Sequence, residues 1–163
     1  MLYTIFQAVI ILGLVCVIAL IINKVEDHKK DFMSFRETLA LTELPIVTFF
    51  QGEHKLNFVL DTGANNSVLD MNAAMPLEVE PTDKVSEYVG MGGKKQMAPM
   101  MNISLTYKDK QYTDCFQVMD MSHVFSKIKE ATGATVHGMI GNAFMQKYKY
   151  VLDFKEMIAY ERK

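Results

Sequence analysis

The residues of this chain whose types and spacing best suit chemistry are Asp61, Thr62 and Gly63. They follow residues 56–60, in which apolar side chains alternate with others at the period of a β-strand. A carboxylate at the end of a buried strand is costly unless it is hydrogen-bonded or shares a proton. The Thr62 hydroxyl can supply a hydrogen bond, and Gly63 permits a sharp turn and a close approach of backbone. This stretch can therefore hold Asp61 where acid–base chemistry requires a carboxylate.

The segments around this stretch predict the elements that position it. Residues 44–55 indicate a strand and a turn, which together form a β-hairpin with the Asp61 strand. Residues 137–145 contain an apolar-Ile-Gly-Asn sequence and a short helix led by Phe, and residues 150–154 form a closing strand. Together with Asp-Thr-Gly-Ala at 61–64, this second motif resembles the retropepsin-like aspartic proteases over residues 44–163. The resemblance implies a mainly β fold, a single-lobe β-barrel.

The resemblance also implies a mechanism in which two carboxylates share one proton, one acting as base on water and the other protonating the carbonyl oxygen. The chain offers one Asp-Thr-Gly, so a symmetric homodimer would supply the second copy. Asp61 of each protomer would then be catalytic. Thr62 would brace the two loops against each other, and Gly63 and Ala64 would line the cleft. A protein or peptide substrate would bind extended, as an added β-strand.

A glycine-rich segment is the second feature of the predicted site. Residues 85–89 form an extended run that leads into Gly90, Met91, Gly92 and Gly93, the composition of a hairpin tip. The resemblance implies that this hairpin is a flap that closes over the substrate. An ordinary surface hairpin is the alternative. A phosphate-binding loop is disfavoured, because the Lys-Ser/Thr pair and the helix of a P-loop do not follow.

The N-terminal segment predicts a membrane anchor. Residues 2–22 are apolar apart from Thr4 and Gln7 and carry no charge, and about 20 such residues span a bilayer as a helix. A cleaved signal peptide would need a basic start, a shorter apolar core and a small-residue cleavage site, which are not evident. We therefore expect an uncleaved single-pass anchor over residues 1–23.

Basic residues follow this apolar segment and none precedes it. By the positive-inside rule, the part of the chain after the anchor is expected on the cytoplasmic side. Residues 24–43 are mixed in charge and predict a partly helical juxtamembrane linker. A basic patch for anionic lipid is the alternative. The predicted folded domain then spans residues 44–163.

Composition argues against several other functions. The formal net charge is −2, which disfavours nucleic-acid binding through phosphate contacts. Cys16 and Cys115 are unlikely partners for a disulfide, because one lies in the apolar segment and the other in a predicted strand. The histidines lack the spacing of metal ligands, so neither a metal nor another cofactor is expected. His137 could be a catalytic base, but an ordinary loop histidine is favoured.

Methionines are numerous, at 13 in the chain. Met97, Met100 and Met101 lie close together in the sequence, as do Met119 and Met121. Flexible core filler and adaptable substrate pockets are both consistent with this residue type. Filler is the favoured interpretation for most of them.

Other polar residues receive structural roles. Asp114 lies in a predicted strand and is expected to be exposed or locally bonded. Asp153 is expected to be structural, because no Thr/Ser-Gly follows it. Ser122 is predicted to cap a short helix that ends near Gly133. Residues 131–134, Ala-Thr-Gly-Ala, look like a degenerate active-site motif, but too few residues follow to build a second lobe, so the match is treated as coincidence.

Three functional hypotheses follow from these observations. The leading one is a membrane-anchored homodimeric aspartic endopeptidase. The second is a catalytically inactive module of the same fold that is tethered to the membrane and binds peptides or partners. The third and weakest is a structural membrane protein whose β-domain serves only for oligomerisation.

Overall fold

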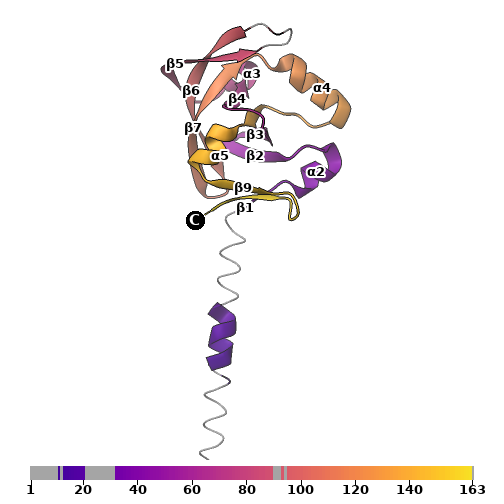
Figure 1. The fold of residues 1–163 in the computed structure, drawn as a ribbon, viewed down its shortest axis with the longest axis vertical. Helices are drawn as coiled ribbons and strands as arrows, with labels where there is room; N and C mark the ends of the chain where they lie inside the picture. The colour runs from indigo at the N-terminus through magenta and orange to yellow at the C-terminus, as the bar shows by residue number, and fades with distance from the viewer. Residues whose placement is uncertain (1–10, 12, 21–31, 90–92, 94, 163) are drawn as a thin grey trace, which may run out of the picture. The chain divides into compact units, whose positions relative to one another are not determined.

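The computed structural model describes residues 11, 13–20, 32–89, 93 and 95–162 (Figure 1). The chain divides into two compact units, residues 1–32 and residues 33–163. The strands are β1 (Phe32–Ser34), β2 (Ile46–Gln51), β3 (His54–Leu60), β4 (Ser67–Asp70), β5 (Val79–Val89), β6 (Lys95–Tyr107), β7 (Lys110–Met119), β8 (Gly138–Ile140), β9 (Tyr150–Asp153) and β10 (Ile158–Glu161). The helices named in Figure 1 are α2 (Arg36–Thr42), α3 (Met71–Ala74), α4 (Ser122–Thr132) and α5 (Asn142–Lys147).

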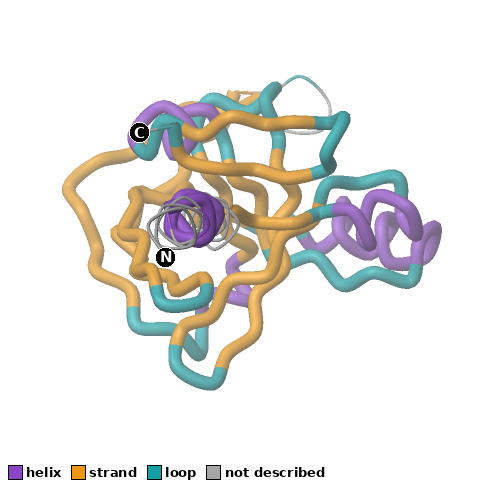
Figure 2. Tube along the Cα trace, turned by 90° about the horizontal axis from the view of Figure 1, so that it is seen from below, coloured by secondary structure: helices purple, strands orange, loops and turns teal. Residues whose placement is uncertain are grey.

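The larger sheet closes on itself. Its strand order is β2-β3-β8-β4-β7-β6-β5. A further pairing of the end strand β2 with β6, at Phe50 and Thr106, closes the ring and leaves β5 as a strand beyond the closure. Figure 2 shows the strands of the folded unit curving around a common interior. The fold is therefore mainly β and forms one barrel-like lobe, as the sequence predicted. The predicted hairpin before Asp61 is the antiparallel pair of β2 and β3.

The pairing of β8 with β3 places two segments that are distant in the sequence side by side. β8 lies between β3 and β4, parallel to β3 and antiparallel to β4. Because β3 leads directly to Asp61 and β8 leads to the Gly-Asn pair at 141–142, these two sequence motifs meet at one edge of the sheet. The resemblance placed both motifs in one domain, and the sheet topology is what brings them together.

The barrel core is apolar and rich in aromatic rings. Phe49 and Phe58 are fully buried and meet edge to face, with ring centroids 5.7 Å apart. Phe49 also contacts Tyr112 and Phe144, which come from β7 and α5. Edge-to-face pairs of this kind add to the stability that burial of apolar area provides. The core thus fixes β3 and α5, the two elements that reach the predicted site.

The folded unit begins earlier than the sequence predicted. β1 and α2 lie within residues 24–43, the predicted linker. Met33 and Phe35 are each only 1% exposed and belong to the main core. β1 pairs with β10 in a separate three-stranded sheet of order β1-β10-β9. The boundary at residue 44 is therefore corrected to Met33, because Met33 and Phe35 of this segment are core residues.

The helix α4 differs from its prediction at one end. It ends at Gly133, whose backbone is left-handed with φ of 76°, as predicted. Ser122 is not a capping residue, however: Met121 holds the cap position and no side chain bonds there. Instead the Ser122 amide and hydroxyl both donate to Asp120 Oδ1, at 2.9 and 2.6 Å. A local carboxylate turn, not a serine cap, therefore precedes the helix.

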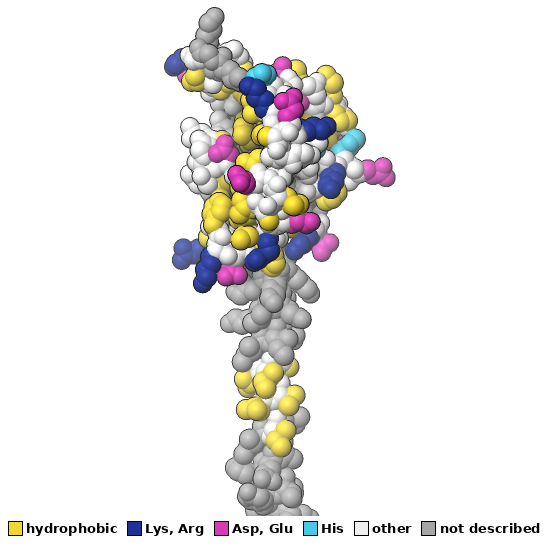
Figure 3. Space-filling view, turned by 90° about the vertical axis from the view of Figure 1, so that its right-hand side faces the viewer, with side chains coloured by type: hydrophobic (Ala, Val, Ile, Leu, Met, Phe, Trp, Pro, Cys, Tyr) yellow, Lys and Arg dark blue, Asp and Glu magenta, His cyan; other side chains and the backbone are white. Residues whose placement is uncertain are grey.

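The first compact unit is described only in part. Residues 11 and 13–20 are helical, and their apolar side chains are exposed, for example Leu20 at 68% and Ile11 at 64% (Figure 3). Within the described residues, no helix combines the length and apolar character needed to cross a membrane. Most of the predicted anchor, residues 1–23, lies outside the described residues.

Candidate active site

Asp61 stands immediately after β3, at the start of a loop that we call the Asp61 loop (residues 61–66). Its amide donates to the Ile140 carbonyl at 3.0 Å, so the loop begins as a continuation of the β3–β8 pairing. The Gly63 amide donates to Asp61 Oδ1 at 2.8 Å, and the Ala64 amide donates to the Asp61 carbonyl at 3.3 Å. The side chain is partly exposed. The loop therefore holds a carboxylate by a backbone hydrogen bond while leaving it accessible.

The first residues of α5 hold the Asp61 loop from the other side. The Asn142 side-chain amide donates to the Thr62 carbonyl at 2.6 Å, and its backbone amide donates to the Ala64 carbonyl at 2.8 Å. The next amide, that of Ala143, donates to the Asn65 carbonyl at 2.9 Å. Three loop carbonyls thus have fixed directions. The Ile-Gly-Asn motif therefore acts on the Asp61 loop as its positioning element.

Gly141 allows this contact because a side chain would not fit. A Cβ at Gly141 would lie 2.5 Å from the Asn66 carbonyl oxygen. The Gly141 amide donates to Ser67 Oγ at 3.2 Å, and the Ser67 hydroxyl points to Asp114 Oδ2 at 3.4 Å. Lys147 Nζ lies 3.7 Å from the other Asp114 oxygen. A buried polar chain therefore links β7 to the first turn of α5.

Asp114 is not exposed, which was one of its two predicted states, although its carboxyl does have the local bond that was the other, to the Cys115 amide. Its side chain is buried, at 7% exposure, between Tyr112 and Phe116 on the inward face of β7. Burial raises the pKa of its carboxyl from the ordinary value of 3.8, and this effect is opposed by the Cys115 amide, by Lys147 and by the Ser67 hydroxyl. Its side-chain partners are far along the chain, so the strand sequence alone carried no sign of them.

A cleft of about 810 Å³ extends from the Asp61 loop beneath the β5–β6 hairpin. Gly63 and Ala64 line it, where the resemblance placed them, together with Asn66 from the same loop. Thr62 does not line this cleft, but lines a separate groove of about 770 Å³. Successive residues of the loop therefore reach two different surfaces. Such a volume is in the range of small-molecule and peptide sites.

The predicted glycine-rich tip joins β5 and β6, which pair as an antiparallel hairpin. Gly93 has a φ of 76°, the left-handed region that favours glycine. The other predicted tip residues, Gly90, Met91 and Gly92, lie outside the described residues. Below the tip, Tyr88 and Gln96 line the cleft, and the Tyr88 hydroxyl lies 2.5 Å from Gln96 Oε1.

Two hydrogen bonds connect Ser86 of β5, in the part of this hairpin nearer the tip, to residues that line the cleft. The Asn66 side-chain amide donates to Ser86 Oγ at 3.0 Å, and that of Gln117 donates to the Ser86 carbonyl at 3.1 Å. Gln117 is only 4% exposed. The sequence did not indicate that Gln117 and Ser67 lie next to the predicted site. The only local signal was a polar side chain within a short apolar strand.

His137 does not act on the Asp61 loop directly. Its Nδ1 accepts the Asn57 amide at 2.9 Å, beside β3 and away from the end that carries Asp61. Burial lowers the pKa of its imidazole, and the nearby Asp70 carboxylate opposes this. The ring nitrogen Nδ1, which a catalytic base would use to accept a proton, already accepts a backbone amide, as expected of a structural loop histidine.

Two further predicted assignments agree with the structure. Asp153 Oδ1 accepts the amides of Lys155 and Glu156 at 3.0 Å each, in the turn between β9 and β10, so its role is structural. Thr132 and Gly133 form the C-terminal end of α4. The Ala-Thr-Gly-Ala sequence at 131–134 is therefore a helix terminus and not a second active-site loop.

A closed β-lobe with an Asp-Thr-Gly loop held by an Ile-Gly-Asn turn defines a retropepsin-like domain. Comparison with protein-family models matches residues 41–153 to the retroviral aspartyl protease family. Because this match covers more than half of the chain, the protein belongs to that family. No curated protein matched the sequence.

Proposed function

We propose that this protein is an aspartic endopeptidase in which Asp61 is the catalytic residue. The observation that carries the proposal is the Asp61 loop, whose partly exposed carboxylate is fixed by the Gly63 amide beside the cleft. One carboxylate, which is ionised, takes a proton from a water molecule while the water oxygen attacks the peptide carbonyl carbon. The other carboxyl, which is protonated, gives its proton to the carbonyl oxygen. The tetrahedral intermediate then collapses. The carboxyl that took the proton from water gives it to the amine nitrogen as the C–N bond breaks, and a hydroxyl of the intermediate returns a proton to the other carboxylate.

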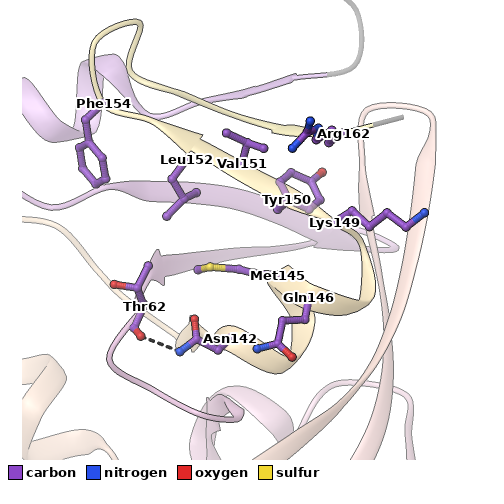
Figure 4. A pocket seen from close by; sticks show the side chains of 10 residues that line it. All are labelled: Thr62, Asn142, Met145, Gln146, Lys149, Tyr150, Val151, Leu152, Phe154 and Arg162. Carbon is purple, nitrogen blue, oxygen red and sulfur yellow. Dashed lines mark hydrogen bonds between the residues drawn. The ribbon is translucent and has the colours of Figure 1, made fainter.

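Two carboxylates are needed, so the active form is a homodimer with one Asp61 from each protomer. The groove that Thr62 lines supports this arrangement. Figure 4 shows Thr62 and Asn142, joined by their hydrogen bond, on one side of the groove and β9 on the other, with Met145 between them. We define this surface as the Thr62 groove.

The Thr62 groove fits a second copy of the chain for two reasons. It is continuous with the loop whose chemistry is incomplete in one protomer. It also borders β9, which is an end strand of the three-stranded sheet in the part of the chain that the structure describes. Phe154 at the end of this strand is 56% exposed. Strand edges and exposed apolar side chains are common features of self-association surfaces.

The proposal includes a single-pass anchor over residues 1–23 with the protease domain on the cytoplasmic side. Its support is the uncharged apolar sequence and the basic residues that follow it. Alkaline extraction of membranes that contain the full chain tests the anchor, and protease protection of sealed vesicles tests the side. Release by alkali would contradict the anchor.

The central test is the Asp61→Asn variant of the full chain, assayed on a peptide library. Asparagine keeps the size of the side chain but cannot share a proton, so hydrolysis should fall by at least about a hundredfold while thermal stability changes little. Asp109→Asn, which removes an exposed carboxylate from the β6–β7 turn, is the matched control and should retain activity. Equal activity of Asp61→Asn and wild type would exclude Asp61 from the mechanism.

The same assay addresses the alternative of an inactive module. A wild-type chain that is folded and dimeric, binds library peptides and cleaves none of them would support the membrane-tethered binding module. Cleavage that depends on Asp61 would exclude it.

A further inference from the structure

Helix α4 packs on the barrel through a small core of its own. Phe125 is buried against Ile46 and Val136, and Val124 and Ile128 pack around them. The main barrel core contains no residue of α4. Figure 1 shows α4 on the outer side of the strands. Helix α4 therefore contributes its buried side chain to this small core and not to the main core of the barrel.

The start of α4 lies on the cleft. Met121, His123 and Val124 line the same hollow as Gly63 and Ala64 of the Asp61 loop. The first turn of this helix and the residue before it thus form a wall of the cleft, while the rest of the helix packs elsewhere.

Three methionines line the cleft next to this wall. They come from three different segments: Met119 from the end of β7, Met121 from the residue before α4, and Met139 from β8. Met119 is buried with Val68 and Ala98, and both other methionines pack against that cluster. Met121 and Met139 also pack against the core of α4. We define Met119, Met121 and Met139 as the methionine subsite.

The wall has a fixed backbone. The Met121 amide donates to Asp70 Oδ1 at 2.8 Å, and the other oxygen of this carboxylate accepts the Asn72 amide at 3.1 Å. Asp70 is 8% exposed, and its own amide donates to the His137 carbonyl at 2.9 Å. One buried aspartate therefore holds both the start of α4 and the chain that returns from it. The methionine side chains can move, while the backbone that carries Met121 is held.

We propose that the first turn of α4 is a specificity-determining wall of the cleft, and that the methionine subsite takes a large, unbranched or aromatic apolar side chain of the peptide. This inference rests on the proposed function. Flexible thioether side chains adapt their shape to long or ring-shaped groups and contact aromatic rings favourably. A small side chain leaves such a subsite unfilled, and a charged one loses its hydration without a partner.

The experiment compares three variants of the full chain on peptides that differ at one position at a time. Met121→Ala and Val124→Ala shorten side chains that line the cleft. Ile128→Ala is the matched control, because Ile128 packs against the same small core without lining the cleft. At one substrate position, the kcat/KM ratio of Phe over Ala should fall by about tenfold in Met121→Ala, and shift in Val124→Ala. It should stay unchanged in Ile128→Ala.

Two results would overturn the inference. The first is unaltered preference at every position in both cleft variants. The second is the same shift in Ile128→Ala, which would trace the effect to loosening of α4. Met121→Leu, which keeps the apolar volume, should restore most of the wild-type preference. If Met121→Ala does not fold, as its melting curve would show, the milder Val124→Ala and Met121→Leu decide the question.

Failure of the proposed function gives a different result. The same peptides are selected by binding to Asp61→Asn protein, with and without Met121→Ala, because this background keeps the cleft and lacks the chemistry. If wild type cleaves nothing, a changed binding preference at one position still supports the methionine subsite. An unchanged binding preference overturns it in that case as well.

Discussion

Asp61 and Asp114 are aspartates in opposite surroundings. Asp61 follows a strand, accepts a backbone amide and is partly exposed. Asp114 lies within a strand, faces inward and is reached by the Ser67 hydroxyl and the Lys147 ammonium group. The first suits proton transfer to a bound substrate. The second connects to the first turn of α5 and so acts on Asp61 only through the fold.

Asp114 makes the stability of the protein depend on pH. Because its folded-state pKa is raised, the folded protein binds the proton of this carboxyl more tightly than the unfolded chain does. Its stabilising contribution is therefore complete below the ordinary value of 3.8 and is lost as the pH rises through the folded-state pKa. We expect Asp114→Asn to raise the free energy of unfolding near neutral pH and to give no such gain at acid pH.

Chemical denaturation at about pH 7 and about pH 3 measures this difference, with the exposed Asp109→Asn as control. A loss of stability at neutral pH in Asp114→Asn would mean that the Lys147 ion pair outweighs the cost of burying the charge.

At the scale of elements, the β5–β6 hairpin lines the cleft and is tied through Ser86 of β5 to the Asp61 loop. The Ser86 hydroxyl and carbonyl accept hydrogen bonds from Asn66 and Gln117. The hairpin is thus held at Ser86, whereas a side chain at Gly93 would meet no atom within 4 Å. A change at the tip should therefore act on the local conformation of the hairpin and not on barrel packing.

We expect Gly93→Val to impair turnover more than stability. A β-branched residue at a positive φ costs on the order of 1–3 kcal/mol, which the tip can relieve by adopting another conformation. Gly52→Val is the matched control, because Gly52 has a φ of 56°, equally open surroundings and a place in the β2–β3 turn. Peptide hydrolysis and thermal melting of both variants measure the effect. Equal turnover of the two variants would argue against a closing flap.

For the molecule as a whole, activity should depend on protein concentration. A dimer that supplies one Asp61 from each protomer forms by mass action, and confinement to a membrane raises the effective concentration of partners. A fragment that begins at Met33, the start of the folded unit, should lose specific activity on dilution. At matched copy number, the anchored full chain should lose less.

A dilution series that combines specific activity with analytical ultracentrifugation tests this expectation. Constant specific activity at concentrations where the fragment sediments as a monomer would contradict both the dimer requirement and the contribution of the anchor. A fragment that begins at residue 44 is unsuitable for the test, because it lacks the buried side chains of Met33 and Phe35.

The sequence by itself determined the local features of this protein. The alternation in residues 56–60 predicted β3, the glycines at 63 and 93 predicted turns, and two short motifs identified the family that the comparison confirmed. These features depend on residues close together in the chain, whose backbone preferences and periodicity can be read directly.

Only the tertiary structure decided what distant segments do to one another. The burial of Asp114 depends on partners from β4 and α5, the start of the folded unit depends on pairing of β1 with β10, and the methionine subsite is assembled from three separate segments. Whether a polar or flexible side chain is exposed, buried or placed in a cleft is set by the elements that pack around it. The topology of the chain determines which elements pack together, and the local periodicity of the sequence does not encode this topology.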